Sequence, residues 1–518
     1  MSQRPSYYVT TPIYYVNDVP HIGHAYTTLA CDVLARFKRL DGYDVMFLTG
    51  TDEHGQKVEK SAEKAGMEPL AFCDKVSARF QDLAAGMNFS NDQFIRTTET
   101  RHRLAVQALW TRLVDKGFIY EDKYAGWYSV RDEAFYTESD LIEGEDKDGE
   151  KLAPTGAPVE WVEEPSYFFK LSALQDQLLE LYENQPDFVM PKSRLNEVKS
   201  FVEGGLLDLS ISRTTFNWGV PVPDQPRHIM YVWIDALTNY LTATGYPDEK
   251  APDYQKYWPA NVHMIGKDIL RFHAVYWPAF LLAADLPLPG RVFAHGWWTN
   301  EGEKISKSLG NVIDPFELIE SYGLDAVRFF LMREVPFGND GDFSRQSFVL
   351  RCNADLAKGL GNLSQRTLSL IHKNCEGIVP QFGEFTNDDN KLLGNVGSLL
   401  NVVRDHMDRQ AFHSALEAIF AQAAAADVYI SRQEPWVLKK TDPARMATVL
   451  YVLAETIRQL AILIQPIMPE SAAKILDQLS VSERGFDQLG EAGRLPVGSL
   501  VPKPVGVFPR LEMPEADV

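Results

Sequence analysis

The stretch that decides the fold is Pro12-Ile13-Tyr14-Tyr15-Val16-Asn17-Asp18-Val19-Pro20-His21-Ile22-Gly23-His24. Residues 7–11 before it are aromatic or β-branched, which favours a strand. After it, apolar residues recur at helical spacing over 29–40, and Gly42 stands where a helix C-cap is expected. A second strand is expected at 44–49. The order strand, loop, helix, strand predicts an α/β domain built on a parallel sheet.

Two histidines, His21 and His24, fall at the expected start of that helix. A helix N-terminus offers unpaired N–H groups and the positive end of the helix dipole, which suit a phosphate. Gly23 between the histidines lets a charged ligand approach the backbone closely. Asp52 follows the second strand, at the edge where open α/β sheets bind ligands. Alone, however, two histidines three residues apart are more often incidental surface residues, and sometimes metal ligands.

A second motif, Lys304-Ile305-Ser306-Lys307-Ser308, lies far along the chain. Such a basic, hydroxylated segment is by itself most simply a solvated loop. The two motifs together, in this order and so far apart, match the two signatures of class I aminoacyl-tRNA synthetases. The chain therefore resembles that class, which implies a Rossmann-like catalytic domain and an ATP-dependent activation of an amino acid.

Length and composition set broad limits. At 518 residues the chain exceeds one ordinary core, so several domains are expected. Hydrophobic content of 45% and charged content of 24% are typical of a soluble globular protein. No apolar run is long enough to predict a membrane span, and the N-terminus lacks a signal-peptide apolar region. The cysteines lack paired spacing and predict reduced thiols in a cytoplasmic protein: Cys31, Cys73, Cys352 and Cys375.

The net charge of −20 argues superficially against a nucleic-acid partner. A local basic face can nevertheless bind RNA on an acidic protein, and the acidic remainder can discourage nonspecific binding. Composition therefore neither supports nor excludes tRNA as a partner.

Changes in the expected secondary structure divide the chain into four segments. Residues 1–117 read as the first half of a Rossmann-like catalytic domain, and 118–225 as an inserted α+β connective module of short aromatic strands around an acidic loop. Alternating strands and helices are expected again at 226–344, which is the second half of the catalytic domain and carries the lysine motif. Residues 345–518 read as an all-α helical bundle with a proline-rich C-terminal tail.

Amino-acid activation determines what the active site needs. The substrate carboxylate attacks the α-phosphorus of ATP, and negative charge builds on phosphoryl oxygens as pyrophosphate leaves. Donors fixed at a helix start and mobile lysines on a loop can stabilise that charge, so no protein nucleophile is required. Magnesium is expected to arrive as the ATP complex. The predicted catalytic residues are His21, His24, Lys304 and Lys307.

Within the class, finer segments are similar to methionyl-tRNA synthetases. These are the N-terminal stretch, Gly-Thr-Asp-Glu-His-Gly at 50–55, Tyr-Val-Trp-Ile-Asp-Ala at 231–236 and Ile-Gly-Lys-Asp at 265–268. The resemblance covers nearly the whole chain. It implies a methionine site formed by Ile13, Tyr15, Asp52, Trp233, Ala236, Leu237, Tyr240, Ile269, Phe272 and His273. It implies an ATP site involving Asn17, Gly23, Asp268, His295, Gly296, Trp297, Ser306 and Ser308.

The chemistry of methionine agrees with that residue set. A thioether is apolar and polarizable, so the aromatic rings of Tyr15, Trp233 and Phe272 suit its sulfur. Asp52 is expected to pair with the substrate ammonium, and a polar tip at His273 or Tyr15 to sense the sulfur. Without the resemblance, aromatic residues beside strands would be read as ordinary core.

The inserted module departs from part of the family. Many relatives carry zinc knuckles there, with cysteine pairs after an aromatic pair. Here Ser129 and Asp132 follow the aromatic pair at 127–128, and the second expected pair falls near Ala153 and Thr155. Ser, Ala and Thr are not zinc ligands at this spacing. We therefore predict no structural zinc, with aromatic packing in its place.

Three residues of the bundle resemble the family's anticodon-reading elements. Asn362 and Arg366 lie four apart, on one face of a helix. Trp436 follows a proline and offers a plane on which an unstacked base can lie, as RNA loops are often read. The alternative is a structural tryptophan and a helix-surface arginine. Nearby cations that could take phosphates are Arg432, Lys439 and Lys440.

These features predict ligation of L-methionine to its tRNA in two steps, through methionyl-adenylate and then transfer to the terminal ribose. A synthetase for another amino acid is one alternative, although the cysteine enzyme would want a zinc site. A simple nucleotidyltransferase would be shorter and lack the bundle. A synthetase-like tRNA-binding or regulatory protein without activity would be expected to have lost one of the two motifs. No dimerising extension follows the bundle, so a monomer is expected.

Overall fold

The structure, a computed structural model, describes residues 4–16, 19–131, 134–136, 138–143, 151–305 and 311–513. Contacts divide the chain into two compact units. The sheet unit comprises Ser6–Pro20 and Met46–His295, and the helical unit comprises Met1–Pro5, His21–Val45 and Gly296–Val518. The four-part domain division drawn from the sequence stays a prediction.

The sheet unit is organised on a seven-stranded sheet of order β10-β16-β15-β1-β3-β2, with β4 also paired to β3. Pairs β1–β15, β15–β16, β10–β16, β2–β3 and β3–β4 are parallel, as the strand–helix–strand pattern predicts. The strands are β1 (Ser6–Thr10), β2 (Tyr14–Tyr15), β3 (Asp44–Asp52), β4 (Gln93–Arg96), β10 (Val189–Met190), β15 (Val262–Gly266) and β16 (Val292–His295).

Most helices of this unit bury apolar side chains in one large core cluster, which includes Tyr8, Leu48, Leu109 and Phe280, whereas Val58 of α2 and Cys73 of α3 belong to a separate, smaller cluster. A π-helical segment, η4 (Phe272–Tyr276), precedes the last helix. The helices of this unit are α2 (Gln56–Lys64), α3 (Pro69–Gly86), α4 (Thr100–Asp115), α5 (Gln175–Asn184), α6 (Lys192–Glu203), α7 (Val232–Leu237), α8 (Asn239–Thr242), α9 (Pro252–Tyr257) and α10 (Trp277–Ala283).

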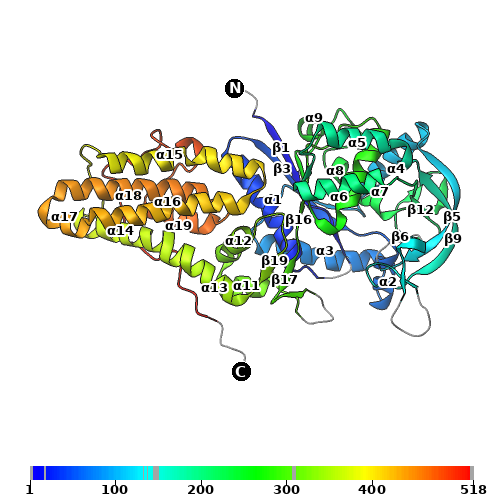
Figure 1. The fold of residues 1–518 in the computed structure, drawn as a ribbon, viewed down its shortest axis with the longest axis horizontal. Coiled ribbons are helices and arrows are strands. Elements are labelled where there is room, and N and C mark those ends of the chain that lie inside the picture. The colour runs from blue at the N-terminus through cyan, green and yellow to red at the C-terminus, as the bar shows by residue number, and fades with distance from the viewer. Residues whose placement is uncertain are drawn as a thin grey trace. The chain divides into compact units, whose positions relative to one another are not determined.

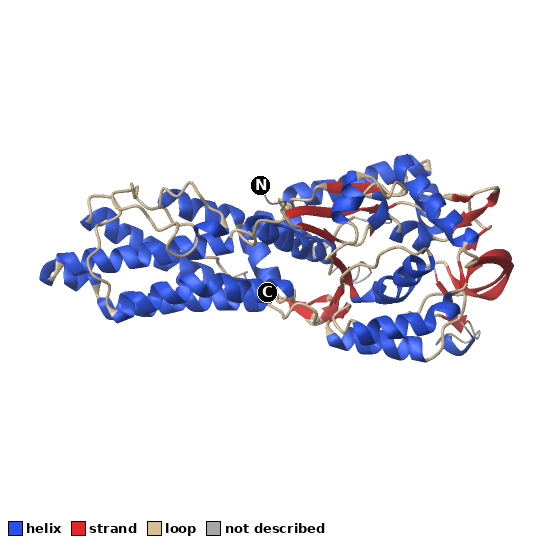
Figure 2. Cartoon of the chain, turned by 90° about the horizontal axis from the view of Figure 1, so that it is seen from above, coloured by secondary structure: helices blue, strands red, loops and turns tan. Residues whose placement is uncertain are grey.

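The inserted module is built on a long antiparallel ribbon of β5 (Ile119–Ser129) and β9 (Glu160–Phe169), which pair along their whole length. Strands β6 (Ala134–Tyr136) and β11 (Leu209–Ser210) extend the ribbon to a four-stranded sheet. Figure 2 shows the ribbon strongly twisted. Smaller pairings join β7 (Ile142–Glu143) to β8 (Lys151–Leu152), and β12 (Ser212–Arg213) and β13 (Pro221–Val222) to β14 (Gln225–Met230).

The helical unit combines α1 (Ile22–Leu40), a small sheet of β17 (Trp298–Asn300), β18 (Glu303–Lys304) and β19 (Gly341–Phe343), and the C-terminal bundle. Figure 1 shows α14, α15, α16 and α18 running lengthwise beside one another. Proline occupies the first turn of α11, α17, α18 and α19, where its missing N–H costs nothing. The helices of this unit after α1 are α11 (Pro315–Tyr322), α12 (Leu324–Arg333), α13 (Arg345–Cys352), α14 (Asn362–Asn374), α15 (Asn387–Asp408), α16 (Phe412–Gln433), α17 (Pro435–Thr441), α18 (Pro443–Ile464) and α19 (Pro469–Gln478).

Helix α18 is the one described helix long and apolar enough to cross a membrane by length and composition. Its apolar window is 94% buried inside the protein. The helix is buried from Thr448 to Ile464 because other helices surround it, as expected for a central bundle helix.

Residues 350–371 carry apolar residues at helical spacing, yet they do not form one continuous α-helix. A π-helical segment, η6 (Asn353–Gly361), separates α13 from α14, and Gly359 within it has φ −81° and ψ −109°, outside the helical range. Glycine has a low helix propensity and admits this conformation at little steric cost. The apolar period of the sequence does not record the break, because the residues on both sides of it remain buried.

Candidate functional sites

The two histidines of the first motif form the N-terminal cap of α1. The His21 side chain accepts from the backbone N–H of Gly23 at Nδ1, and the His24 Nδ1 accepts from the N–H of His21, each at 3.1 Å. The rings stack obliquely with centroids 4.0 Å apart. A Cβ on Gly23 would lie 2.9 Å from Cε1 of His21, so a side chain at this position would displace that ring. The predicted placement at the helix start is confirmed.

This reciprocal capping also fixes the tautomer of both rings. Because a backbone N–H can only donate, Nδ1 of each neutral imidazole must be the unprotonated acceptor, and Nε2 must carry the proton. Burial and, second, the proximity of His21 lower the pKa of His24 well below its ordinary value, although the residue as a whole is only partly buried. Each neutral ring is thereby a hydrogen-bond donor through Nε2, at the positive end of a helix.

The lysine motif begins on a hairpin in the helical unit. Strands β17 and β18 pair Thr299 with Lys304, and the turn between them contains Glu301 and Gly302 at positive φ. The Asp342 carboxylate accepts from the Gly302 N–H at 2.8 Å and from the Thr299 hydroxyl at 2.6 Å, so it holds the base of the hairpin. The predicted residues Ser306, Lys307 and Ser308, and the side chain of Lys304, lie outside the described residues.

Several predicted residues lie at the carboxyl ends of parallel strands in the sheet unit. Asp52 is the last residue of β3 and is buried, and His295 is the last residue of β16. Asp268 follows β15, whose Gly266 pairs with His295. A Cβ on Gly266 would lie 2.5 Å from Oδ1 of Asp268, so a side chain at this position would displace that carboxylate. This edge is where a parallel sheet binds ligands. Asn17 lies outside the described residues.

Gly296 and Trp297 follow in the helical unit. A Cβ on Gly296 would lie 2.3 Å from the backbone of Asn339, so only glycine allows these two segments to approach. The Trp297 N–H donates to the Asp340 carboxylate at 2.8 Å, and its carbonyl accepts from Gly341. The Trp297 side chain is 43% exposed, which makes its ring accessible to a flat ligand.

The predicted methionine residues include a tight aromatic stack. The rings of Trp233 and Phe272 lie face to face, 3.5 Å apart and 8° from parallel. Tyr15 pairs with Asp52 across β2 and β3 and donates from its hydroxyl to the carbonyl of His54 at 3.0 Å. Leu237 belongs to the large core cluster of the sheet unit, and Ile13 and Ile269 pack against that cluster. Ala236 is buried on α7.

Tyr240 and His273 form the polar part of this set. Nδ1 of His273 lies 3.0 Å from the carbonyl of Ile269, so it carries the proton and donates. Nε2 therefore accepts from the Tyr240 hydroxyl at 2.7 Å. Burial lowers the pKa of His273 to about 4, so the ring is neutral at physiological pH. His273 lies in the π-helical segment η4, a deviation that often occurs at functional sites.

The predicted anticodon residues lie on α14 and α17. Asn362 is exposed at the start of α14, and the Arg366 guanidinium lies 4.7 Å from the centre of the Trp436 ring. Oδ1 of Asp427 on α16 lies 3.8 Å from Nη1 of Arg366. Glu434, with φ of 44°, makes the corner between α16 and α17 that presents Trp436. The structure thus brings Arg366 and Trp436 together. Exposed cations near this corner are Arg432, Lys439 and Lys440.

At the positions where relatives carry zinc ligands, the module has other contacts. Ser129 and Ala153 are buried, and Thr155 accepts from Arg131 through its carbonyl at 2.7 Å. Among the described residues no cluster of His, Cys, Asp or Glu could hold a metal ion. Asp132 lies outside them, so the absence of zinc stays a prediction. Aromatic packing is present nearby, with Trp127 and Trp161 edge to face at 5.4 Å.

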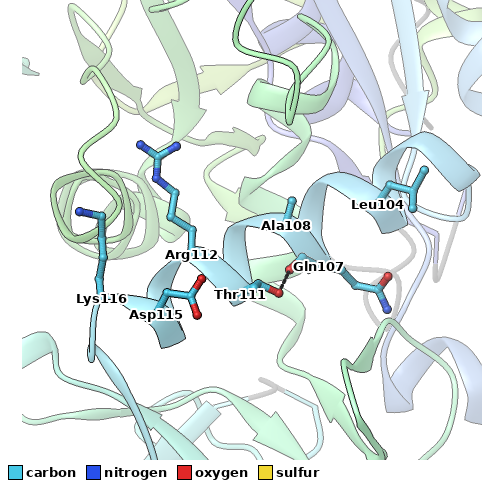
Figure 3. A pocket seen from close by; sticks show the side chains of 7 residues that line it. All are labelled: Leu104, Gln107, Ala108, Thr111, Arg112, Asp115 and Lys116. Carbon is cyan, nitrogen blue, oxygen red and sulfur yellow. Dashed lines mark hydrogen bonds between the residues drawn. The ribbon is translucent and has the colours of Figure 1, made fainter.

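A shallow groove of about 500 Å³ follows the outer side of α4 (Figure 3). It contains none of the residues predicted to act on a substrate. Two of its cations are engaged, since Arg112 pairs with Glu249 and Lys116 with Asp285. The groove is lined by Leu104, Gln107, Ala108, Thr111, Arg112, Asp115 and Lys116.

Comparisons with known proteins decide the family. Residues 7–368 match the family described as "tRNA synthetases class I (M)", and residues 379–516 match "Anticodon binding domain of methionyl tRNA ligase". The chain belongs to the methionyl-tRNA synthetase family. It is 57% identical to the methionine–tRNA ligase of Rhizobium meliloti over 100% of both chains, and 58% identical to that of Brucella suis over 98% of both.

Solved structures of methionyl-tRNA synthetases agree. A structure of the Mycobacterium tuberculosis methionyl-tRNA synthetase in complex with methionyl-adenylate superposes with a TM-score of 0.95 at 55% identity, covering 98% of this chain and 100% of that one. The apo form of the same protein gives a TM-score of 0.90 at 51% identity, covering 99% of each chain. The predicted fold class is confirmed: a Rossmann-like domain with an inserted module, followed by an all-α bundle.

Sequence reasoning missed the residues that hold these side chains in place. Asp342 supports the hairpin of the lysine motif, Asp427 flanks Arg366, and His102 of α4 reaches a buried carboxylate, Asp235, on α7. Their partners are distant in sequence or belong to other elements, so no local spacing marks them. Of these residues, only Asp235 could have been suspected from the sequence, because it lies in the segment at 231–236 that resembles the family.

Proposed function

We propose that this chain ligates L-methionine to tRNA(Met) in two steps. ATP and methionine first form methionyl-adenylate and pyrophosphate. The terminal ribose of the tRNA then attacks the adenylate carbonyl and releases AMP. The observation that carries this proposal is the full-length match to proteins named methionine–tRNA ligase, together with the likeness to a methionyl-adenylate complex.

For the first step, we assign phosphate stabilisation to His21, His24, Lys304 and Lys307. The capping geometry supports the histidines, because both neutral rings donate through Nε2 and a donor fixed before the reaction needs no reorganisation. Magnesium would arrive as the ATP complex and would offset negative charge on the phosphates. The residues assigned to ATP are Asn17, Gly23, Asp268, His295, Gly296, Trp297, Ser306 and Ser308.

For methionine, we assign the ammonium to the buried carboxylate of Asp52 and the thioether to the apolar and aromatic residues around Trp233 and Phe272. The bond from the Tyr240 hydroxyl to a neutral His273 supports this assignment, because it leaves the polar end of the pocket uncharged. An uncharged polar group can lie next to a thioether, whereas a buried charge would need a partner of opposite charge that the thioether does not provide. The full set is Ile13, Tyr15, Asp52, Trp233, Ala236, Leu237, Tyr240, Ile269, Phe272 and His273.

For the second step, we assign anticodon recognition to Asn362, Arg366 and Trp436. The exposed indole of Trp436 offers a stacking plane, and Arg366 already lies against its ring. We further propose that the chain acts as a monomer in the cytoplasm and needs no structural zinc.

Pyrophosphate exchange into ATP, run without tRNA against each of the twenty standard amino acids, tests the reaction. Exchange with methionine alone is expected, and it should be abolished by His24→Ala or Lys307→Ala. Exchange with a different amino acid would keep the class and contradict the pocket. No exchange from folded protein, even with tRNA added, would favour the tRNA-binding or regulatory alternative.

A further inference from the structure

One carboxylate, Asp235, lies at the centre of a buried polar network in the sheet unit. It belongs to α7 and is completely buried. Its Oδ2 lies 2.7 Å from Nδ1 of His54, and its Oδ1 lies 2.8 Å from Nε2 of His102. The chain of contacts continues from Nδ1 of His102 to the Thr242 hydroxyl at 3.1 Å. The two imidazoles thus occupy both oxygens of the carboxylate.

The network joins the segments assigned to methionine without including any residue of that set. His54 lies two residues after Asp52, and its carbonyl accepts the Tyr15 hydroxyl. Asp235 lies two residues after Trp233, immediately before Ala236 and Leu237. The end of β3 and helix α7 are therefore joined through one carboxylate, and His102 ties both to α4.

The charge on Asp235 makes the network rigid. Burial alone would raise the pKa of this carboxyl, but His54 and His102 hold it at about 2, so the group is ionised. An ionised carboxylate only accepts, so both imidazoles must donate to it, and hydrogen bonds to a buried charge are stronger than neutral ones. Its two oxygens point to two different elements, which restricts how α7 can shift against β3.

We propose that Asp235 is a positioning residue of the methionine pocket. Through His54 and His102 it fixes the helix that carries Trp233 against the strand end that carries Asp52. The inference rests on the proposed function, because it takes that pocket as the methionine site. A displacement of the indole relative to the carboxylate weakens the fit for methionine, whereas the histidines at the start of α1 retain their own cap.

The test is a comparison of methionine and ATP recognition in Asp235→Asn. The amide keeps the shape but loses the charge and one acceptor, so one histidine is left unmatched. We expect the methionine Kd, measured by calorimetric titration without ATP, to rise about tenfold, the scale of one charge-assisted hydrogen bond. The KM for ATP in pyrophosphate exchange should stay within about twofold, since a distortion spread over the whole catalytic site would change both constants.

Two further variants separate positioning from general destabilisation. Glu164→Gln is the matched control, because Glu164 is a buried carboxylate of the inserted module that accepts from Thr214. It should lower the unfolding midpoint without changing the methionine Kd. At His102, His102→Gln keeps a donor toward Asp235 and should bind methionine nearly as the wild type does, whereas His102→Ala should bind more weakly.

A folded Asp235→Asn that binds methionine like the wild type would overturn the proposal, as would an equal loss in Glu164→Gln. If Asp235→Asn does not fold, the two His102 variants test the proposal. Equal methionine Kd values for His102→Gln and His102→Ala would then overturn it. The pocket assignment fails separately. In that case Asp52→Asn leaves methionine binding unchanged, or the wild type binds no methionine.

Discussion

Arg328 of α12 and Asp32 of α1 form an ion pair of 2.6 Å in which both side chains are completely buried. The same guanidinium donates to the carbonyls of Pro466 and Ile467, which follow α18. Three segments of the helical unit therefore meet at one cation, and one of them is the helix that His21 caps. At its other end, α1 is tied to α15 by the ion pair of Arg404 with Asp41.

Asp32→Asn should be strongly destabilising. It leaves the Arg328 guanidinium buried without a counter-charge, and breaking one partner of a buried pair typically costs about 3–5 kcal/mol. Denaturant unfolding followed by far-UV circular dichroism measures the change. The control is Arg409→Ala, which removes an exposed pair with Asp405 and should cost less than about 1 kcal/mol. Equal losses in the two variants would contradict the role given to the buried pair.

Stability should fall as the pH is lowered from about 6.5 towards 4. Burial lowers the pKa of His273 to about 4, and the pKa values of His24 and His263 are also well below the ordinary value. In this window the unfolded chain takes up protons that the folded chain does not, so acid favours unfolding. Thermal midpoints across the window measure the effect, and His273→Gln should flatten the slope. A midpoint independent of pH between 6.5 and 5 would contradict it.

Much of the fold could be predicted from the sequence because its main helices and strands are marked by local residue patterns. The expected helix over 29–40 is part of α1, and Gly42 lies just past its end with φ of +88°. The strands expected at 7–11 and 44–49 correspond to β1 and β3. Sequence spacing also placed Arg366 one turn after Asn362 on a single helix. Such features depend on residues a few positions apart, which is the range that periodicity and capping describe.

The remaining features of the site and fold could not be predicted from the sequence, because they depend on side chains that come together only after folding. His54, His102 and Asp235 are far apart in the chain, and each alone looks like an ordinary polar residue. The capping role of His21 needed the actual direction of its ring. The π-helical segment before α14 was hidden because apolar residues on both sides of it stay buried.

The inserted module should contain no zinc. Its candidate positions include the buried Ser129 and Ala153, which offer no metal ligand. Purified protein analysed by inductively coupled plasma mass spectrometry should hold far less than one zinc per chain, and a chelator should leave the unfolding midpoint unchanged. Trp161→Ala, which removes the contact with Trp127, should lower that midpoint instead. Stoichiometric zinc that a chelator removes with loss of stability would contradict the prediction.

Gly23→Ala should impair amino-acid activation. The added Cβ would lie 2.9 Å from the His21 ring, so the ring must shift and the cap of α1 is disturbed. A misplaced donor of this kind typically costs about tenfold or more in rate. Pyrophosphate exchange measures the loss. The matched control is Gly394→Ala on α15, where the Cβ meets no atom within 4 Å and a helical alanine is favourable. Unchanged exchange in Gly23→Ala would argue against the role given to His21.

Trp436→Ala should impair tRNA charging while leaving methionine activation intact. The indole is 39% exposed beside Arg366, and stacking of a base on an aromatic ring is worth about 1–3 kcal/mol, so kcat/KM for tRNA should fall about tenfold or more. Trp436→Phe keeps a stacking plane and should lose less. The control is Phe316→Ala on α11, a ring of matching exposure at 40%. Equal loss of charging in Trp436→Ala and Phe316→Ala, or loss of pyrophosphate exchange in Trp436→Ala, would refute an anticodon role for Trp436.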